Sequence, residues 1–155
     1  MSNQLAVRKA RVSDLDNLTA LEQRTFDYSR ISRRNFRRLI QSSSVNFWVI
    51  TEGQKLITYA ITLARKNSRF WRIYSIAVDS QHRNRGLARA MLEHIITEAK
   101  KDQRQGLTLE VKVDNIVAIK LYQYYDFETV DLLPDYYDDG TDGFKMRLTF
   151  YPENH

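Results

Sequence analysis

The longest amphipathic pattern of the chain lies between Gly86 and Asp102. Apolar residues recur there at helical spacing, at Leu87, Met91, Leu92, Ile95, Ile96 and Ala99. Positions three and four apart share one face of a helix, so the pattern predicts a long helix with a buried stripe. Gly106, which follows Lys100 and Lys101, is the predicted stop signal of this helix.

Two shorter helices are predicted in the first third of the chain. Ser13 is a possible N-cap, with Asp16 three residues later. The leucines that follow at helical spacing are Leu15, Leu18 and Leu21. Ser32 is a second possible N-cap, for the segment "RRNFRRLIQ". A narrow apolar stripe in this segment consists of Phe36, Leu39 and Ile40. Its basic face consists of Arg33, Arg34, Arg37 and Arg38.

The other apolar segments are rich in β-branched and aromatic residues, which favour strands. They span residues 5–10, 45–51, 55–65, 69–78, 107–113, 127–133 and 143–150. Glu52 and Gly53 lie between the second and third of these segments, which are therefore predicted to pair as an antiparallel hairpin. Asn115 is a possible N-cap for a further helix over 116–125. The predicted order is β-α-α-β-β-β-α-β-α-β-β, a mixed α/β fold.

Composition narrows the classes of protein and of site. With 155 residues and 43% hydrophobic residues, the chain is expected to form one domain over residues 1–155. It has no run of 18 apolar residues and no secretory signal pattern, so we expect a cytoplasmic protein with no membrane partner. It has no cysteine, and its histidines are scattered, so neither thiol chemistry nor a metal site is expected. The net charge of +5 favours an anionic partner, such as nucleic acid, a ribosomal surface or a polyphosphate cofactor.

Gly86 and the arginines around it form the first candidate binding site. The first amides of a helix lack intrahelical partners and carry the positive end of its dipole, so they bind phosphate. Glycine removes the Cβ that would keep a pyrophosphate from the backbone, and Arg83, Arg85 and Arg89 add positive charge. An equal alternative is that Gly86 only eases the chain into the helix and the arginines form a solvated face. Neither the G-x-G-x-x-G nor the G-K-[ST] loop is present.

Three motifs, in the same order along the chain, resemble those of the GNAT superfamily of N-acetyltransferases. "RNRGLA", residues 83–88, resembles the R/Q-x-x-G-x-G/A motif, whose backbone amides hold the pyrophosphate of acetyl-coenzyme A (acetyl-CoA). "LEVKVDNIVAIKLYQYYDF" and "DYYDDGTDGFKMRL" are similar to runs of the N-terminal protein acetyltransferases, particularly the ribosomal-protein-alanine N-acetyltransferases. The resemblance implies a GNAT fold, in which helices flank a mostly antiparallel sheet.

The resemblance also implies an acetyl-CoA site, with no metal. The residues that it places at the pyrophosphate are Arg83, Asn84, Arg85, Gly86, Leu87, Ala88 and Arg89. The backbone of Ile76, Ala77 and Val78 would line the pantetheine arm where a strand splays from its neighbour, and an amide near Val78 would polarise the thioester carbonyl. Asn115 could be only an N-cap, but in the family the matching residue also contacts the cofactor, and Tyr122 is placed beside the cofactor as well.

Glu110 and Tyr122 are the candidate catalytic residues. Glu110 stands between apolar residues in a predicted strand, and the resemblance implies a general base that acts directly or through a water. From the alternation alone, a glutamate that faces solvent or pairs with an arginine is the simpler interpretation. A phenol can protonate a departing thiolate, and the resemblance implies this role for Tyr122, although a core tyrosine with a surface hydroxyl shows the same pattern. Without cysteine, no acetyl-cysteine forms, so we expect direct attack by the amine in a ternary complex.

The resemblance also implies which residues contact the amine acceptor, and the sequence departs from the family pattern at two positions. The substrate-facing positions are Phe26, Tyr28, Tyr136 and Tyr137, where paired aromatics could equally be local packing. Asp126 replaces the usual glycine after the predicted helix over 116–125, and aspartate tolerates the left-handed conformation that this turn needs. Thr58 replaces a frequent glycine and is expected to narrow or reshape the acceptor slot. The arginines of segment 30–38 are expected to be a solvated face, or else to attract an acidic peptide or a ribosomal surface.

Three hypotheses follow, in order of preference. The first is an enzyme that acetylates the α-amine of a protein or peptide N-terminus, such as that of a ribosomal protein. The second keeps the acetyl transfer but takes a lysine side chain or a small amine, because the cofactor motif is shared across the superfamily. The third is a basic nucleic-acid-binding module, which leaves Glu110, Asn115 and Tyr122 unexplained.

Overall fold

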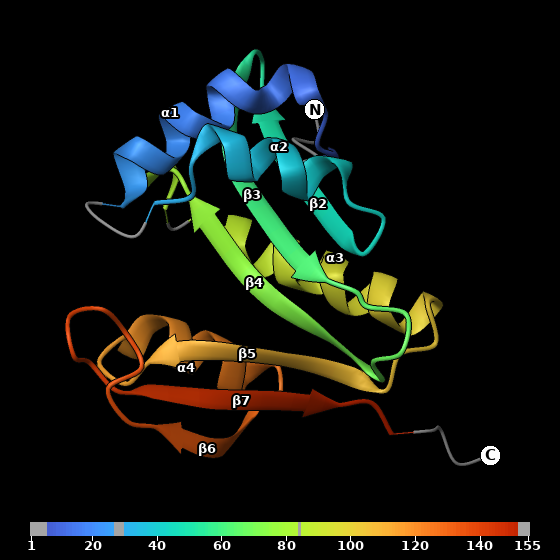
Figure 1. Cartoon of the computed structure of the whole chain (residues 1–155), viewed down its shortest axis with the longest axis vertical. Coiled ribbons are helices and arrows are strands. Elements are labelled where there is room, and N and C mark those ends of the chain that lie inside the picture. The colour runs from blue at the N-terminus through green and yellow to red at the C-terminus, as the bar shows by residue number, and fades with distance from the viewer. Residues whose placement is uncertain (1–5, 27–29, 84, 152–155) are drawn as a thin grey trace.

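The computed structural model describes residues 6–26, 30–83 and 85–151, and within these it contains seven strands in one sheet (Figure 1). The strands are β1 (Val7–Lys9), β2 (Val45–Glu52), β3 (Lys55–Leu63), β4 (Phe70–Val78), β5 (Gly106–Lys112), β6 (Glu128–Leu133) and β7 (Gly143–Thr149). The helices are α1 (Leu15–Thr25), α2 (Arg33–Gln41), α3 (Leu87–Lys101) and α4 (Ile116–Tyr124). The predicted order of strands and helices is confirmed.

The sheet has the strand order β1-β2-β3-β4-β5-β7-β6, and only β4 and β5 are parallel neighbours. They are parallel because α3 connects them as a crossover. Their pairing stops after Ile73 and Leu109, although both strands continue. Tyr74 has no partner in β3 at this point, and such a bulge bends a strand. As a result β4 and β5 separate toward their C-terminal ends (Figure 1).

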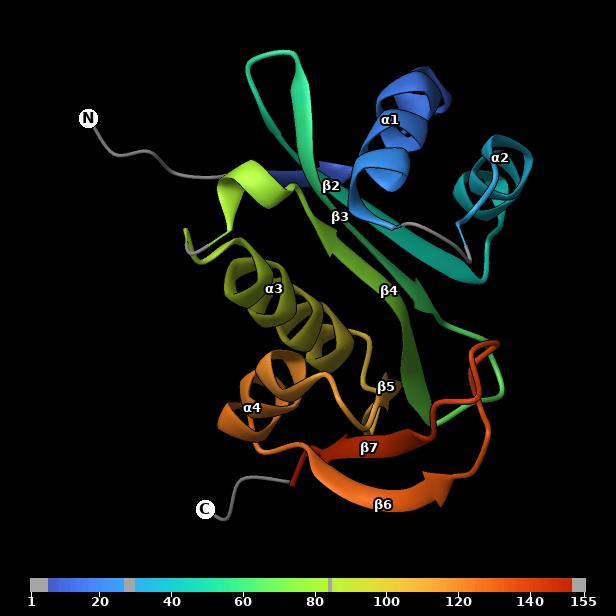
Figure 2. The same ribbon diagram turned by 90° about the vertical axis from the view of Figure 1, so that its left-hand side faces the viewer.

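Hydrophobic cores cover both faces of the sheet. α1 and α2 lie on one face and α3 and α4 on the other (Figure 2). Alternation along β2 divides its residues between the two: Phe47 and Val49 pack with α1 and α2, whereas Trp48 and Ile50 pack with α3. The predicted stripe of α3 is buried, except that Ile96 is partly exposed. Each fully buried leucine of this kind contributes about 1.5–3 kcal/mol by leaving water.

Two of the three predicted N-cap side chains cap a helix in the structure. Ser32 Oγ accepts a hydrogen bond from the Asn35 amide (3.2 Å), and Asn115 Oδ1 accepts one from the Ala118 amide (3.2 Å), so both predicted N-caps are confirmed. The prediction for Ser13 is wrong, because this residue lies in a short 3₁₀ turn before α1. Asp14 stabilises this turn instead, because its carboxylate accepts hydrogen bonds from the Arg8 guanidinium and the Arg11 amide.

The predicted stop of α3 at Gly106 is also wrong. The helix ends at Lys101, and Gln103 adopts the left-handed conformation with φ 60°. The amides of Gln103 and Arg104 then bond back to the carbonyls of Lys100 and Ala99, which closes a Schellman motif without glycine. Gly106 begins β5, where a Cβ would lie 2.0 Å from the Leu148 carbonyl oxygen. This glycine therefore serves close strand packing.

Candidate active site

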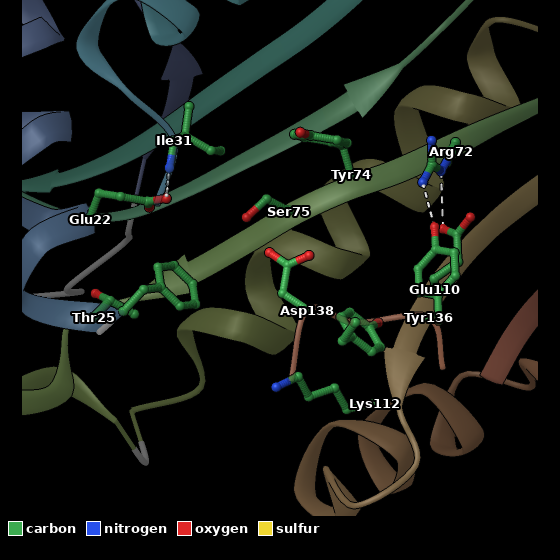
Figure 3. A pocket seen from close by; sticks show the side chains of 12 residues that line it. Glu22, Thr25, Ile31, Arg72, Tyr74, Ser75, Glu110, Lys112, Tyr136 and Asp138 are labelled. Atoms are coloured by element: carbon green, nitrogen blue, oxygen red, sulfur yellow. Dashed lines mark hydrogen bonds and ion pairs between the residues drawn. The ribbon is translucent and has the colours of Figure 1, made fainter. Parts of the chain in front are cut away.

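A cavity of about 570 Å³ opens where β4 and β5 separate (Figure 3). Its wall includes α1, the C-terminal halves of β4 and β5, and the loop between β6 and β7. It is lined by Glu22, Thr25, Phe26, Ile31, Arg72, Tyr74, Ser75, Glu110, Lys112, Tyr136, Tyr137 and Asp138. Three carboxyl side chains, those of Glu22, Glu110 and Asp138, thus line one space from segments that are far apart in sequence.

Glu110 lines this cavity and is paired with an arginine. Leu109 and Val111 on either side of it are buried in the core, so the alternation of β5 directs Glu110 to the other face. Its Oε2 accepts a hydrogen bond from Arg72 Nε at 3.0 Å, and 18% of the glutamate side chain is exposed. Arg72 Nη2 also reaches the Tyr136 hydroxyl at 3.4 Å. The carboxylate is therefore held in a fixed position at the cavity wall.

Glu22 also lines the cavity, and the sequence analysis missed it. The side chain is buried, and its two oxygens accept hydrogen bonds from the Tyr59 hydroxyl (2.6 Å) and the Ile31 amide (2.7 Å). The Tyr59 hydroxyl in turn lies 3.0 Å from Ser75 Oγ. Burial raises the pKa of Glu22, against the lowering effect of the two bonds and of nearby Arg30. A signal existed, because Glu22 falls on the leucine face of α1, four residues after Leu18.

Tyr122 lies on α4 and is not among the residues that line this cavity. Its ring packs against Phe127 with 5.5 Å between ring centroids. Burial, with a smaller effect of Tyr137, raises the pKa of Tyr122 to about 12. The same Tyr137 interacts electrostatically with Glu110, so it lies near both predicted catalytic residues. Tyr122 remains protonated at neutral pH, as a proton donor must.

The start of α3 has the conformation that its glycine requires. Gly86 has φ +74°, in the left-handed region, and a Cβ built on it would meet nothing within 4 Å. Backbone freedom therefore explains the glycine, and the space beside it is open. Arg85 pairs with Glu52 at 2.8 Å, and Arg89 stacks over the Tyr124 ring at 4.8 Å. Arg83 is exposed.

The other residues predicted for the cofactor fall into three groups. Asn84 lies outside the described residues. Leu87 is buried and Ala88 half-buried, so Leu87 offers only its backbone to a ligand. Ile76, Ala77 and Val78 pair with β3 along one edge of β4, while their other edge faces the gap toward β5. Asn115 caps α4, as predicted.

Asp79 anchors the loop that joins β4 to α3. Its buried carboxylate lies 2.8 Å from His82 Nδ1 and 3.3 Å from both Lys55 Nζ and Arg24 Nε. Burial alone would raise the pKa of Asp79, but these three partners outweigh it and lower the pKa. This network fixes the segment that leads into Gly86.

The predicted acceptor residues are partly brought together. Phe26, Tyr136 and Tyr137 line the cavity with Glu110, and the two tyrosine rings meet edge to face with centroids 5.1 Å apart. Tyr28 lies outside the described residues. Thr58 is fully buried in β3 and is not among the residues that line the cavity, so it does not narrow this cavity directly; an effect of Thr58 on the shape of the acceptor slot stays a prediction.

No group of three or more histidine, cysteine, aspartate or glutamate side chains that could hold a metal ion occurs within the described part of the chain. Over the same residues, no helix is long and apolar enough to cross a membrane. The chemistry that the cavity itself offers is acid–base chemistry by carboxylates and phenols beside a helix start that suits phosphate.

Comparison with known proteins agrees with this arrangement. A model of the acetyltransferase (GNAT) domain matches residues 11–150. The chain belongs to the GNAT family of acetyltransferases. It is 31% identical over 137 residues to the [ribosomal protein bS18]-alanine N-acetyltransferase of Escherichia coli (strain K12), with 88% of this chain and 89% of that protein covered. It is 29% identical over 154 residues to an N-alpha-acetyltransferase of Saccharolobus solfataricus, with 90% of each covered.

The fold of this GNAT chain also matches a solved structure. The crystal structure of the ribosomal-protein-S18-alanine N-acetyltransferase from Escherichia coli superposes with a TM-score of 0.86 and 29% sequence identity, and the match covers 98% of this chain and 99% of that one. The predicted resemblance and fold class are thereby confirmed. The protein is an acyltransferase, so the two enzymatic hypotheses take precedence over a nucleic-acid-binding module.

Proposed function

We propose that this GNAT enzyme transfers the acetyl group of acetyl-CoA to the α-amine of a protein or peptide N-terminus. The observation that carries the proposal is the position of Glu110, in a cavity that opens where β4 and β5 separate. The similarity to a ribosomal-protein-alanine N-acetyltransferase supports a protein acceptor, with a ribosomal protein as the first candidate and the cytoplasm as the compartment.

The residues present fit acetyl-CoA. The first turn of α3 offers free amides beside Gly86, where the absent Cβ leaves open space for a pyrophosphate. Exposed Arg83 and the partly engaged Arg85 and Arg89 add positive charge. The free edge of β4 over 76–78 leads from this helix start toward the cavity, which suits the pantetheine arm. When bound, acetyl-CoA supplies the activated acetyl group.

Glu110 is the proposed general base. The α-amine must lose a proton as its nitrogen forms a bond to the thioester carbonyl carbon, and a carboxylate at the cavity wall can take that proton directly or through a water. Arg72 fixes the carboxylate in place. Because the chain has no cysteine, no acetyl-cysteine intermediate is available, and the amine attacks within a ternary complex.

Tyr122 is the proposed general acid. As the carbon–sulfur bond breaks, the thiolate needs a proton, and a phenol that stays protonated at neutral pH can donate it. Tyr122 does not line the cavity of about 570 Å³, which we call the acceptor cavity, so we propose that it acts from the cofactor side of the reacting carbon. α3 and α4 meet there through Arg89, Glu93 and Tyr125.

The proposed acceptor contacts are Phe26, Tyr136 and Tyr137, whose rings would pack against the first residues of a peptide. The test is free-thiol release from acetyl-CoA with a panel of peptides that have different free N-termini, each matched by an N-blocked peptide that contains lysine, together with small amines. We expect turnover only with free N-termini. Turnover confined to lysine or small amines would overturn the α-amine acceptor, and no turnover with any amine would overturn the acetyl transfer itself.

A further inference from the structure

A second cavity, of about 360 Å³, adjoins the acceptor cavity. Ile31 and Tyr74 line both, so the two cavities are neighbours that share these side chains as part of their walls. One helical face of α2 and the residue that follows it form part of its wall, through Asn35, Arg38, Leu39 and Ser42. A peptide that extends out of the acceptor cavity over Tyr74 would therefore lie beside this second cavity.

The two cavities differ in charge. The acceptor cavity is lined by side chains of both signs, the carboxyl groups of Glu22, Glu110 and Asp138 and the cations Arg72 and Lys112. The second is lined by the three arginines Arg30, Arg38 and Arg65, and no aspartate or glutamate is among its lining residues. We call these three residues the arginine groove.

Within the part of the chain that the structure describes, no carboxylate lies at ion-pair distance from an arginine of the groove, although Glu22 is near enough to Arg30 to interact with it electrostatically. Arg30 donates to the backbone carbonyls of Phe26 and Gln23, which leaves its positive charge in place. Among the described residues, neither Arg38 nor Arg65 makes an ion pair with a carboxylate. An arginine without a carboxylate partner, beside a substrate cavity, is suited to a carboxylate of the ligand.

We propose that the arginine groove selects acceptors with acidic side chains a few residues after the acetylated N-terminus. The inference rests on the proposed function and adds a sequence class to it. A peptide is favoured over nucleic acid because the groove adjoins the acceptor cavity and is small. Specific nucleic-acid interfaces bury about 600 Å² of protein surface or more.

The experiment compares peptides with one free N-terminal alanine and with acidic, neutral or basic residues at positions 2–6. In the wild-type enzyme, kcat/KM for the acidic peptide should exceed that for the neutral one by about three- to tenfold, because exposed ion pairs are individually weak. The advantage should shrink as salt is raised, and the basic peptide should be the poorest acceptor. Equal kcat/KM for the three peptides would overturn the proposal.

A matched pair of variants locates the effect. R38E reverses a charge inside the groove, whereas R37E makes the same change on an exposed position of α2 that does not line the groove. We expect R38E to lower the acidic-to-neutral ratio to about one or below, and R37E to retain it. An equal fall of the acidic-to-neutral ratio in both variants would show that net charge alone sets the preference, and this would overturn the proposal.

A binding measurement distinguishes failure of this proposal from failure of the proposed acetyl transfer. The anisotropy of a fluorescent, N-acetylated acidic peptide is measured with wild type, R38E and R37E, so no turnover is needed. Binding that R38E alone weakens supports the groove even if no peptide is acetylated, and no binding overturns it. A single-stranded RNA that displaces the peptide and binds more tightly, with the same dependence on Arg38, would overturn the peptide in favour of nucleic acid.

Discussion

Glu22 and Glu110 face one cavity from opposite sides, and their partners give them different properties (Figure 3). Glu110 is held by a charged partner, Arg72, at 3.0 Å. Glu22 has only neutral hydrogen-bond donors, from Tyr59 and the Ile31 backbone, and it is buried. The charged form of Glu22 is therefore disfavoured, and its carboxyl group is a source of pH dependence within the site.

Replacing Glu22 by glutamine should change how stability depends on pH. The pKa of Glu22 is raised above its ordinary value of 4.5, so the folded state binds this proton more tightly than the unfolded state does. The stabilising contribution is complete below 4.5 and is lost as pH rises through the folded pKa. The free energy of unfolding of wild type minus that of E22Q should therefore fall as pH rises through this window.

Urea denaturation over a series of pH values measures this difference. E128Q, which removes an exposed carboxylate on β6, is the control and should show no comparable trend. A difference between wild type and E22Q that rises with pH would mean that the carboxylate is stabilised by its partners, contrary to this account.

Replacing Tyr122 by phenylalanine should lower turnover more than it weakens acetyl-CoA binding. The variant keeps the ring that packs on Phe127 and removes only the proposed proton donor. General acids typically contribute about 10²–10⁴-fold, so we expect kcat to fall by at least about tenfold. Single-turnover kinetics and acetyl-CoA titration separate the two effects. The control is Y124F, which changes an exposed tyrosine of the same helix. An equal loss of acetyl-CoA binding and turnover in Y122F would contradict the role of Tyr122 as general acid.

At the residue scale, sequence predicts what is local. Ser32 and Asn115 each accept a hydrogen bond from the backbone amide three residues later, so a short segment of sequence is enough to predict their capping roles. The bond from Tyr59 to Glu22 joins residues 37 apart, and the pair of Arg72 and Glu110 joins residues 38 apart. No local pattern specifies such partners, which is why the sequence analysis missed Glu22 and left Glu110 with two interpretations.

At the element scale, the end of α4 shows how Asp126 takes the place of glycine. Asp126 has φ 70°, so the expectation that aspartate preserves the left-handed turn is confirmed. The amides of Asp126 and Phe127 bond to the carbonyls of Gln123 and Tyr122, both at 3.0 Å. This is a Schellman motif, and the contact between the rings of Phe127 and Tyr122 is its usual hydrophobic partner. The turn thus holds the proposed general acid.

Replacing Asp126 by glycine should stabilise the protein. Glycine adopts φ 70° without a Cβ penalty, so we expect a gain of about 0.5 kcal/mol, reduced by the greater entropy of the unfolded chain. Alanine has the penalty and no polar side chain, so D126A should lose about 1 kcal/mol. Chemical denaturation of the three proteins gives the order directly. A D126G less stable than wild type would show that the aspartate side chain makes a bond of its own.

Replacing Gly86 by alanine should cost both stability and cofactor affinity. Alanine in the left-handed region costs about 1 kcal/mol, and its Cβ would enter the open space at the start of α3. Gly140, with φ +84° and equally open surroundings, is a matched control in the loop between β6 and β7. Calorimetric titration with acetyl-CoA should show weaker binding for G86A and unchanged binding for G140A. Equal affinity in both variants would place the pyrophosphate elsewhere.

Elements with strong periodicity are predictable, and their ends are less so. The stripe of α3 and the β-branched strands were recognisable because burial repeats along them. The end of α3 was assigned to Gly106, the conspicuous glycine, whereas Gln103 makes the turn. A non-glycine residue in the left-handed conformation is held there by the surrounding chain, and its own residue type gives no sign of it.

At the scale of the whole molecule, one parallel pair of strands brings the parts of the site together. β4 and β5 start side by side and end apart, so their C-terminal ends frame the acceptor cavity. Residues 79–86 join the end of β4 to the start of α3, which brings the helix start that we propose for phosphate binding to the same end of the sheet (Figure 2). The order of elements was predictable from the sequence. The separation of the strands was expected only from the family resemblance and not from the residue pattern, because it depends on where pairing stops and on the bulge at Tyr74.

The central claim is that the enzyme acetylates an α-amine. The most direct test uses one peptide that carries both a free N-terminal alanine and an internal lysine, incubated with acetyl-CoA and analysed by tandem mass spectrometry. We expect one acetyl group, located on the N-terminal residue, and no product from the same peptide with a blocked N-terminus. An acetyl group on the lysine, or an unmodified peptide in the presence of an enzyme that binds acetyl-CoA, would contradict it.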